Sequence, residues 1–265
     1  MKRQILIAVG VLSLAIPAVV RADDAANALM NASHQAYYYA ADGGSAKVAM
    51  VITDKKGRTR EREFWMLRRD VADMGDQRYY TYFLRPADVA RTTFLVHKRA
   101  EGNDDRWLYT PSVDLVTRIA AGNRQRPFFG SEFTYEDVSG RLPILDNHEI
   151  LGPDTAMGRK ATKVKSTPKD AGTSDWDYRL SWIDDDTKLP LREEFYKKDK
   201  LVRTFLAESI ETIEEIPTAI VRTMIDDKSG GKTTITFAEI TYEAPMDADQ
   251  FNERLLKNPP SEYTR

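Results

Sequence analysis

Cysteine is absent from the 265 residues of this chain, which excludes disulfides, thiolate metal sites and cysteine catalysis. Histidine is scarce: His34, His97 and His148 lie far apart, and none has a second histidine or a cysteine at the spacing of a metal site. We therefore expect no metal and no other cofactor. A domain of this length buries roughly three quarters of the surface of its unfolded chain, so a large core can replace disulfides as the source of stability.

Long apolar runs are also missing, with one exception at the start of the chain. Lys2 and Arg3 precede an apolar run from Ile5 to Ile16, and Pro17 and the small residue Ala22 follow it. This is the layout of a cleaved secretory signal peptide. The alternative, a membrane anchor, requires an apolar run of roughly 20 residues. We expect cleavage after Ala22, a mature protein in the periplasm, and a single domain over residues 23–265.

Positive charge is not in excess. Removal of residues 1–22 takes away three basic residues and leaves 36 basic residues against 41 acidic ones, a net charge near −5. Because binding to a phosphate backbone requires a positive surface, we expect no nucleic acid among the partners.

Constellations of catalytic residues are absent as well. Ser131 lies in the sequence FFGSEF, which lacks the second glycine of a nucleophile elbow. The acidic clusters Asp104-Asp105, Asp184–Asp186 and Asp226-Asp227 lack the alternating spacing of a calcium loop and are better explained as solvated turns. Glu193 and Glu194 are neighbours in a predicted strand, so their carboxylates point to opposite faces. We expect no catalytic residue and no enzymatic activity.

Alternation of apolar and polar residues dominates what the sequence does contain. A helical stripe over Asp23–Ala40 is followed from Ser45 onward by strand-like runs with a period of two, separated by turns such as Lys55-Lys56-Gly57. These short separators leave no room for crossover helices, so the strands should pair sequentially and antiparallel. The long runs Leu189–Thr212 and Ala219–Tyr242, each folded about a tight turn, suit a barrel or a half-barrel. The sequence therefore predicts a mainly β fold with a few helices.

Large apolar side chains recur at alternate positions, so each predicted strand has one apolar face. These side chains either pack a dry core or line a cavity for an acyl chain on a concave face of the sheet. Methionine suits the second use, because its flexible thioether adapts to irregular ligands. The candidates for the lining of such a cavity are Met50, Phe64, Met66, Tyr80, Tyr82, Leu84, Phe94, Trp107, Tyr109, Trp176, Tyr178, Leu180 and Trp182.

Arginine residues within these apolar strands have two interpretations. They lie on the solvent face of a half-buried sheet, or they reach polar head groups at the mouth of a cavity. The residues concerned are Arg60, Arg62, Arg118, Arg179 and Arg203.

Two blocks of the sequence resemble the LolA-like outer-membrane lipoprotein-sorting proteins. The first consists of Trp107, Tyr109 and Pro111 in the pattern W-x-Y-x-P, then Arg118-Ile119, then FFGSEFTYEDV at Phe128–Val138. The second consists of Leu189-Pro190-Leu191-Arg192, Glu194-Phe195-Tyr196 and Leu201-Val202-Arg203. The resemblance extends over most of the mature chain.

This resemblance implies a strongly curved, open antiparallel sheet, that is, an incomplete β-barrel with helices covering its concave side and a hydrophobic cavity between them. It implies a periplasmic carrier that binds lipid or lipoprotein acyl chains noncovalently and takes part in outer-membrane lipoprotein sorting or lipid transport. Its partners would be an inner-membrane exporter and an outer-membrane acceptor, and we expect a monomer. The alternative is a non-carrier accessory or interaction subunit of an envelope transporter complex, in which the half-barrel is filled by its own side chains.

Phe128–Val138, here called the aromatic segment, concentrates large side chains around a glycine. We expect Gly130-Ser131 to start a short helix with Glu132 in its first turn, where an acidic charge suits the helix dipole. Its aromatic side chains must be buried, either as a fixed plug in the mouth of the half-barrel or as a lid that leaves it when cargo enters. The side chains in question are Phe128, Phe129, Phe133 and Tyr135.

Overall fold

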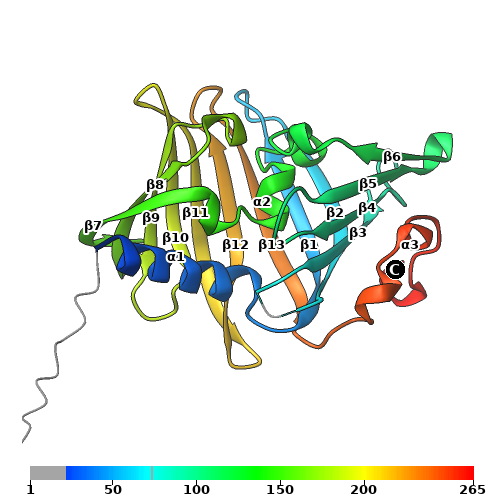
Figure 1. Cartoon of the computed structure of the whole chain (residues 1–265). Helices are drawn as coiled ribbons and strands as arrows, with labels where there is room; N and C mark the ends of the chain where they lie inside the picture. The colour runs from blue at the N-terminus through cyan, green and yellow to red at the C-terminus, as the bar shows by residue number, and fades with distance from the viewer. Residues whose placement is uncertain (1–21, 73) are drawn as a thin grey trace, which may run out of the picture.

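One antiparallel sheet of thirteen strands forms the frame of the molecule (Figure 1), in the order β6-β5-β4-β3-β2-β1-β13-β12-β11-β10-β9-β8-β7. The computed structural model describes residues 22–72 and 74–265, so the predicted leader, apart from Ala22, lies outside the described residues. The strands are β1 (Gly43–Thr53), β2 (Thr59–Asp70), β3 (Gln77–Arg85), β4 (Thr93–Lys98), β5 (Asp105–Thr110), β6 (Leu115–Ile119), β7 (Asp146–Ala156), β8 (Arg159–Pro168), β9 (Tyr178–Asp184), β10 (Pro190–Lys197), β11 (Lys200–Ile213), β12 (Ile216–Asp226) and β13 (Gly231–Thr241).

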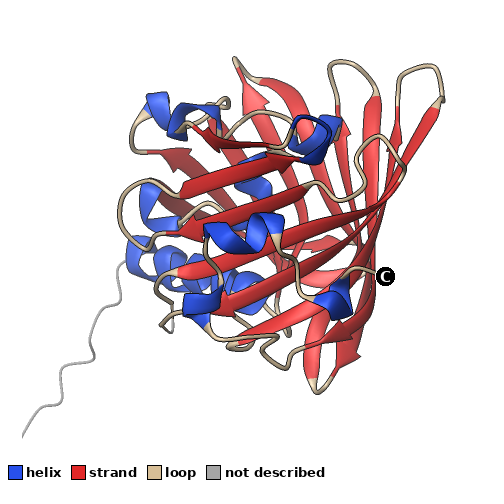
Figure 2. Ribbon diagram, turned by 90° about the vertical axis from the view of Figure 1, so that its right-hand side faces the viewer, coloured by secondary structure: helices blue, strands red, loops and turns tan. Residues whose placement is uncertain are grey.

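The sheet is curved and open, which confirms the predicted half-barrel. Strands β6 and β7 are its two edges and do not pair with each other. The twist of the long strands, seen from the side in Figure 2, follows from the right-handed twist of β-structure accumulated over many strands. The chain passes from β6 to β7 through residues 120–145, which therefore run from one edge of the sheet to the other. The aromatic segment belongs to this crossing.

The helix α1 (Ala22–Tyr38) agrees with the predicted helix to within two residues at its end. Asp23 and Asp24 lie in its first turn, where acidic side chains suit the positive end of the helix dipole. Its buried stripe includes Met30, which packs against Val164 of β8 and Ile183 of β9 on the concave face. Within the described residues, no helix combines the length and the apolar character needed to cross a bilayer.

The second half of the chain is the predicted meander. Strands β10 and β11 pair about the turn at Lys198-Asp199, and β12 and β13 pair about the turn that precedes Gly231. Residues 169–177 connect β8 and β9, which pair with each other, so this stretch joins two strands of one sheet. Local turn chemistry and a period of two were sufficient to predict these pairings.

The C-terminal residues cover part of the convex face. Asp247 and Gln250 form a capping box around the 3₁₀ helix Ala248–Gln250, and α3 (Glu253–Lys257) follows. Phe251 precedes α3, which Asn252 caps with its side chain. Phe251 and Leu256 are buried against residues of β2 to β4, including Leu67, Tyr80 and Leu95. The β2–β4 region of the sheet is thus apolar on both faces.

Candidate functional site

The aromatic segment is buried against the concave face of β2, β3 and β4. The ring of Phe128 lies 6.2 Å from the rings of Phe64 and Phe83 and 5.6 Å from the ring of Phe94, measured between centroids. Phe129 packs against Phe83 at 4.1 Å. Phe128, Phe133 and Tyr135 are buried in the main hydrophobic core, and Phe129 is partly buried against it. These aromatic rings fill the half of the concave side that lies over the first strands.

The local structure of this segment differs from the prediction, which was wrong about where the helix begins. Phe128–Gly130 forms a 3₁₀ turn, and the helix α2 begins only at Tyr135 and ends at Ser139. Thr134 is its N-cap: the Thr134 hydroxyl accepts a hydrogen bond from the Asp137 backbone, and the Asp137 carboxylate accepts one from the Thr134 backbone. This reciprocal capping box satisfies two backbone donors, which a helix start at Gly130-Ser131 could not do.

Polar contacts fix both ends of α2. Lys98 of β4 is fully buried and donates hydrogen bonds to the carbonyl oxygens of Ser139 and Gly140 at the C-terminal end. Burial lowers the pKa of Lys98 to about 8. At the other end, Arg203 of β11 pairs with Asp137, and the backbone N–H of Glu132 donates to the hydroxyl of Thr233 on β13 at 3.0 Å.

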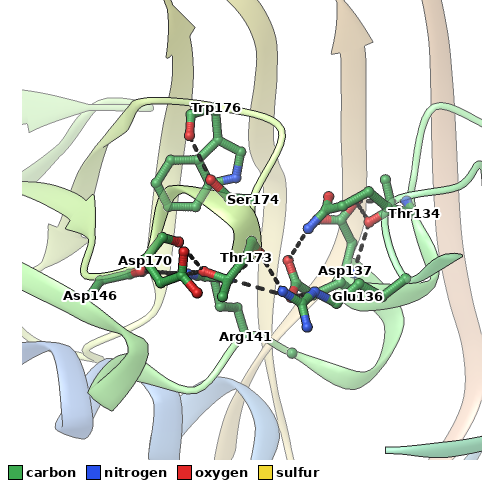
Figure 3. A network of polar contacts seen from close by, with 12 residues as sticks. Thr134, Glu136, Asp137, Arg141, Asp146, Asp170, Thr173, Ser174 and Trp176 are labelled. Atoms are coloured by element: carbon green, nitrogen blue, oxygen red, sulfur yellow. Dashed lines mark hydrogen bonds and ion pairs between the residues drawn. The ribbon is translucent and has the colours of Figure 1, made fainter. Parts of the chain in front are cut away.

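Arg141 connects the end of α2 to the other edge of the sheet (Figure 3). Its guanidinium donates to both carboxylate oxygens of Asp146, at 2.7 to 3.1 Å, and to the backbone oxygen and hydroxyl of Thr173 at 2.9 and 3.0 Å. A Glu136 carboxylate oxygen lies 3.5 Å from the same guanidinium. The Arg141 side chain is only 5% exposed and that of Asp146 is fully buried, so this network is interior.

An apolar cavity lies beside the aromatic segment, between the end of α1, α2 and the concave face of β1, β12 and β13. We call it the main cavity because it is the larger of two adjoining interior spaces; its volume is about 140 Å³. Its lining includes Tyr37, Met66, Val138, Arg222, Ile235 and Phe237. A cavity of this size holds a ligand roughly as large as benzene. It is smaller than the several hundred Å³ that are typical of ligand pockets.

A second, more polar space adjoins the main cavity and shares Tyr37, Tyr38, Phe133 and Asp137 with it. We call it the His34 chamber; its volume is about 70 Å³. Four charged residues face it, namely Asp137, Arg141, Arg179 and Glu193. The ion pair between Arg179 and Glu193 spans 3.2 Å. The interior of the half-barrel therefore passes from an apolar wall to a charged one.

His34 of α1 is buried at the wall of this chamber, and neither ring nitrogen has a hydrogen-bond partner among the described residues. Burial, together with the positive charges of Lys98 and Arg179, lowers the pKa of His34 to about 3. The imidazole is therefore neutral in the folded protein at physiological pH. Asp137 and Glu193, which also face the chamber, are each paired with an arginine and do not reverse this effect.

The substitution His34→Gln is expected to flatten the pH dependence of stability between pH 6.5 and 4. The ordinary histidine pKa of 6.5 applies to the unfolded chain, so below that pH the unfolded state binds a proton that the folded state does not bind. At pH 5 this costs the wild type about 2 kcal/mol of unfolding free energy relative to pH 7.5. Urea unfolding of both proteins at the two pH values measures the difference. The matched control is His97→Gln, whose histidine is only half-buried; an equal effect of both substitutions would contradict the assignment.

The thirteen residues predicted to line a cavity lie on both faces of the sheet. Met66 lines the main cavity, Met50, Phe64 and Phe94 lie in the concave core, and Trp176 lies at the other end of that core. Another group packs with the C-terminal segment on the convex face: Tyr80, Tyr82, Leu84, Trp107 and Tyr109. Leu180 and Trp182 belong to a separate cluster with Leu191, and Tyr178 stacks on Tyr196 at 4.8 Å.

The arginine residues that left two interpretations open do not all lie on one face of the sheet. Arg179 and Arg203 face the interior, where their guanidinium groups lie 5.8 and 5.0 Å from the ring of Phe195. Arg62 lies opposite Met50 on the concave face of β2 and pairs with Asp88 at the rim. Arg118 is exposed and pairs with Asp105. Arg60 donates to the carbonyl oxygen of Gly130 in the aromatic segment at 3.2 Å.

The sequence interpretation missed His34, Tyr37 and Arg222 as residues of the interior. A signal for Arg222 was present, because Arg222 and Met224 are two residues apart in one strand and must share a face. A signal for Tyr37 was present too, since it lies seven residues after Met30 on one stripe of α1. Nothing local distinguishes His34 from a histidine in an ordinary core.

Comparison with known proteins supports the fold. A family model with the description "uncharacterized protein" matches residues 75–258. A DUF1329 family protein from Desulfovibrio piger is 24% identical, with a TM-score of 0.81 over 89% of this chain and 99% of that chain. A putative outer membrane lipoprotein-sorting protein domain from Vibrio parahaemolyticus is 23% identical, with the same TM-score and coverage. A LolA superfamily protein from Nitrosomonas europaea is 16% identical, with a TM-score of 0.67 over 86% of this chain and 98% of that one. No curated protein matches the sequence.

Proposed function

This chain belongs to a LolA-like family, and from that premise we propose that it is a periplasmic carrier of lipid or lipoprotein acyl chains. It binds the chain noncovalently between the concave face of the sheet and the helices, without a cofactor and without catalysis. Its place in the periplasm rests on the signal-peptide pattern of residues 1–22. In this role it takes part in outer-membrane lipoprotein sorting or lipid transport.

The observation that carries this proposal is the main cavity. Tyr37, Met66, Ile235 and Phe237 form an apolar wall, and the cavity lies at the inner face of a half-barrel whose relatives include a putative lipoprotein-sorting domain. Each methylene buried there contributes about 0.8 kcal/mol. Because an acyl chain gains the same energy inside a membrane, transfer requires a partner that loosens the cargo. An inner-membrane exporter as donor and an outer-membrane acceptor fit this need.

The close packing of the aromatic side chains in this segment favours a second candidate function. Phe128 and Tyr135 fill the interior over β2 to β4, and Phe133 lines the main cavity, which holds no more than a small ligand as it stands. A half-barrel filled in this way could serve as a non-carrier accessory subunit of an envelope transporter complex. The two candidates differ in whether the isolated protein binds an acyl chain.

Uptake of a fluorescent acyl probe by delipidated protein separates the two candidates. Val138, on α2, is half-buried and lines the main cavity, so Val138→Trp should occupy the space and weaken probe binding by roughly tenfold or more. The control is Val113→Trp, at a position that is 66% exposed and far from the cavity lining. Native mass spectrometry of protein from a membrane-containing host should show lipid adducts. If the wild type shows no adducts and takes up no probe, the carrier function fails and the accessory function remains.

A further inference from the structure

Arg222 is a cation in the wall of an otherwise apolar cavity. It lies on β12, two residues before the buried Met224, and its guanidinium carbon is 4.5 Å from the centre of the Tyr37 ring and 4.2 Å from that of Phe237. Its Nε donates to the carbonyl oxygen of Ala219 at 2.8 Å. Two aromatic faces and one backbone bond thus hold the guanidinium at the edge of the main cavity, which all three side chains line.

No acid among the described residues forms an ion pair with Arg222. Across residues 22–72 and 74–265, no carboxylate oxygen forms an ion pair with Arg222 within 4.0 Å. The other charged residues that line the cavity have partners of their own, because Arg68 pairs with Asp70 at 3.0 Å and Asp137 pairs with Arg203. A partly buried charge at an apolar wall is costly when it is unpaired. An anion that entered the cavity would remove this cost and gain a charge-assisted hydrogen bond.

The hydroxyl of Tyr37 can add a second donor beside Arg222. Burial raises the pKa of Tyr37 to about 12, so the phenol keeps its proton at neutral pH and does not compete with an anion. Tyr37 also lines both the main cavity and the His34 chamber. A planar guanidinium and a phenol O–H match the oxygen atoms of a carboxylate or a phosphate.

We propose that Arg222 and Tyr37 form an anion-binding site in the main cavity and that the cargo is an amphiphile with an acyl chain and an anionic head. The apolar wall of Met66, Ile235 and Phe237 receives the chain, and the carboxylate or phosphate of the head binds Arg222. This inference rests on the proposed carrier function and names its class of cargo. A cargo with a neutral head group would lack the contact with Arg222.

The test compares ligands that differ only in the charge of the head. Displacement of a fluorescent acyl probe measures the affinity of three ligands: a saturated fatty acid, the fatty alcohol of equal length and the monoalkyl phosphate of that alcohol. The measurements are made at pH 8 and below the micellar concentration. The wild type should bind the acid or the phosphate at least about tenfold more tightly than the alcohol. The anionic ligand whose affinity exceeds that of the alcohol by the larger factor identifies the natural head group as a carboxylate or a phosphate.

Arg222→Met keeps an unbranched apolar side chain and should lose this preference, while its affinity for the alcohol stays within about twofold of the wild type. Arg222→Lys keeps the charge and should retain part of the preference, which guards against a folding defect in the methionine variant. The matched control is Lys163→Met, which removes a cation 4.3 Å from the Trp182 ring, away from the cavity. Equal binding of acid, phosphate and alcohol by the wild type would overturn the anion site and leave the carrier function standing. Binding of none of the three would overturn both.

Discussion

Arg141→Met is expected to lower the free energy of unfolding by about 3–5 kcal/mol. The substitution leaves the carboxylate of Asp146 without the cation that donates three hydrogen bonds to it, in a place where the Asp146 side chain has no exposed surface. It also removes the bonds to Thr173, on the connection between β8 and β9. A buried charge that loses its partner keeps the full cost of its desolvation, and this cost exceeds the net worth of the intact pair. Urea unfolding measures the loss as a shift of the midpoint at unchanged slope.

Two controls separate the buried charge from the mere loss of an arginine. The double variant Arg141→Met/Asp146→Asn removes both charges and should recover a large part of the lost stability. Arg58→Met breaks an ion pair with Asp54 at 2.6 Å, but its arginine side chain is 76% exposed, so a loss below about 1 kcal/mol is expected. If Arg141→Met costs no more than Arg58→Met, the network in Figure 3 does not hold α2 against the edge of the sheet.

The strand order and the half-barrel could be predicted because their signals are local. A period of two along each strand and a turn between consecutive strands are sufficient when neighbours in sequence are neighbours in the sheet, as they are from β1 to β6 and from β7 to β13. The pairing of β1 with β13 is the one long-range junction, and it follows once the two meanders share a sheet. The resemblance at Phe128–Val138 supplied what periodicity could not, namely that the segment between the meanders covers the concave side.

The face of the sheet that encloses the cavity could not be predicted from periodicity. In β3, Tyr79 and Phe83 face the concave core while Tyr80 and Tyr82 face the C-terminal segment, so both faces of this strand are apolar. A period of two then says which residues share a face but not which face is enclosed. Which face is enclosed depends on Phe251 and Leu256, which lie more than 160 residues away in the chain and cover the convex side of the strand.

The positions of the charged residues in the interior could not be predicted from local sequence either. Arginine in a strand is usually exposed, and the interior places of Arg179, Arg203 and Arg222 depend on partners from other elements. Arg203 meets Asp137 from a segment 66 residues earlier in the chain, and Arg222 lies between Tyr37 of α1 and Phe237 of β13. These contacts form only when the crossing residues 120–145 and α1 lie in the half-barrel. The polar part of the candidate site is therefore a property of the tertiary structure.

A disulfide between the aromatic segment and the sheet is expected to abolish binding of long acyl chains. The variant Glu132→Cys/Thr233→Cys introduces the only cysteines of the chain, at two positions joined by a hydrogen bond of 3.0 Å. This bond limits the distance between the two Cα atoms to about 7 Å, near the upper limit for a disulfide. The main cavity, at about 140 Å³, is too small for a chain of sixteen carbons, so the aromatic segment must move when such a chain enters. The oxidised variant should bind a long-chain probe at least about a hundredfold more weakly than the reduced one.

The same experiment decides between a lid and a fixed plug. The matched control is Thr223→Cys/Thr234→Cys, which links β12 and β13 at residues directly opposite each other and leaves the aromatic segment free. Its oxidation should not change binding, and reduction of the first variant should restore the affinity of the wild type. A six-carbon probe should bind both oxidised variants alike, because it fits the cavity as it stands. Long-chain binding that is unchanged by the first disulfide would instead mean that Phe128, Phe133 and Tyr135 are a permanent part of the core and that cargo enters only the space between Tyr37 and Phe237.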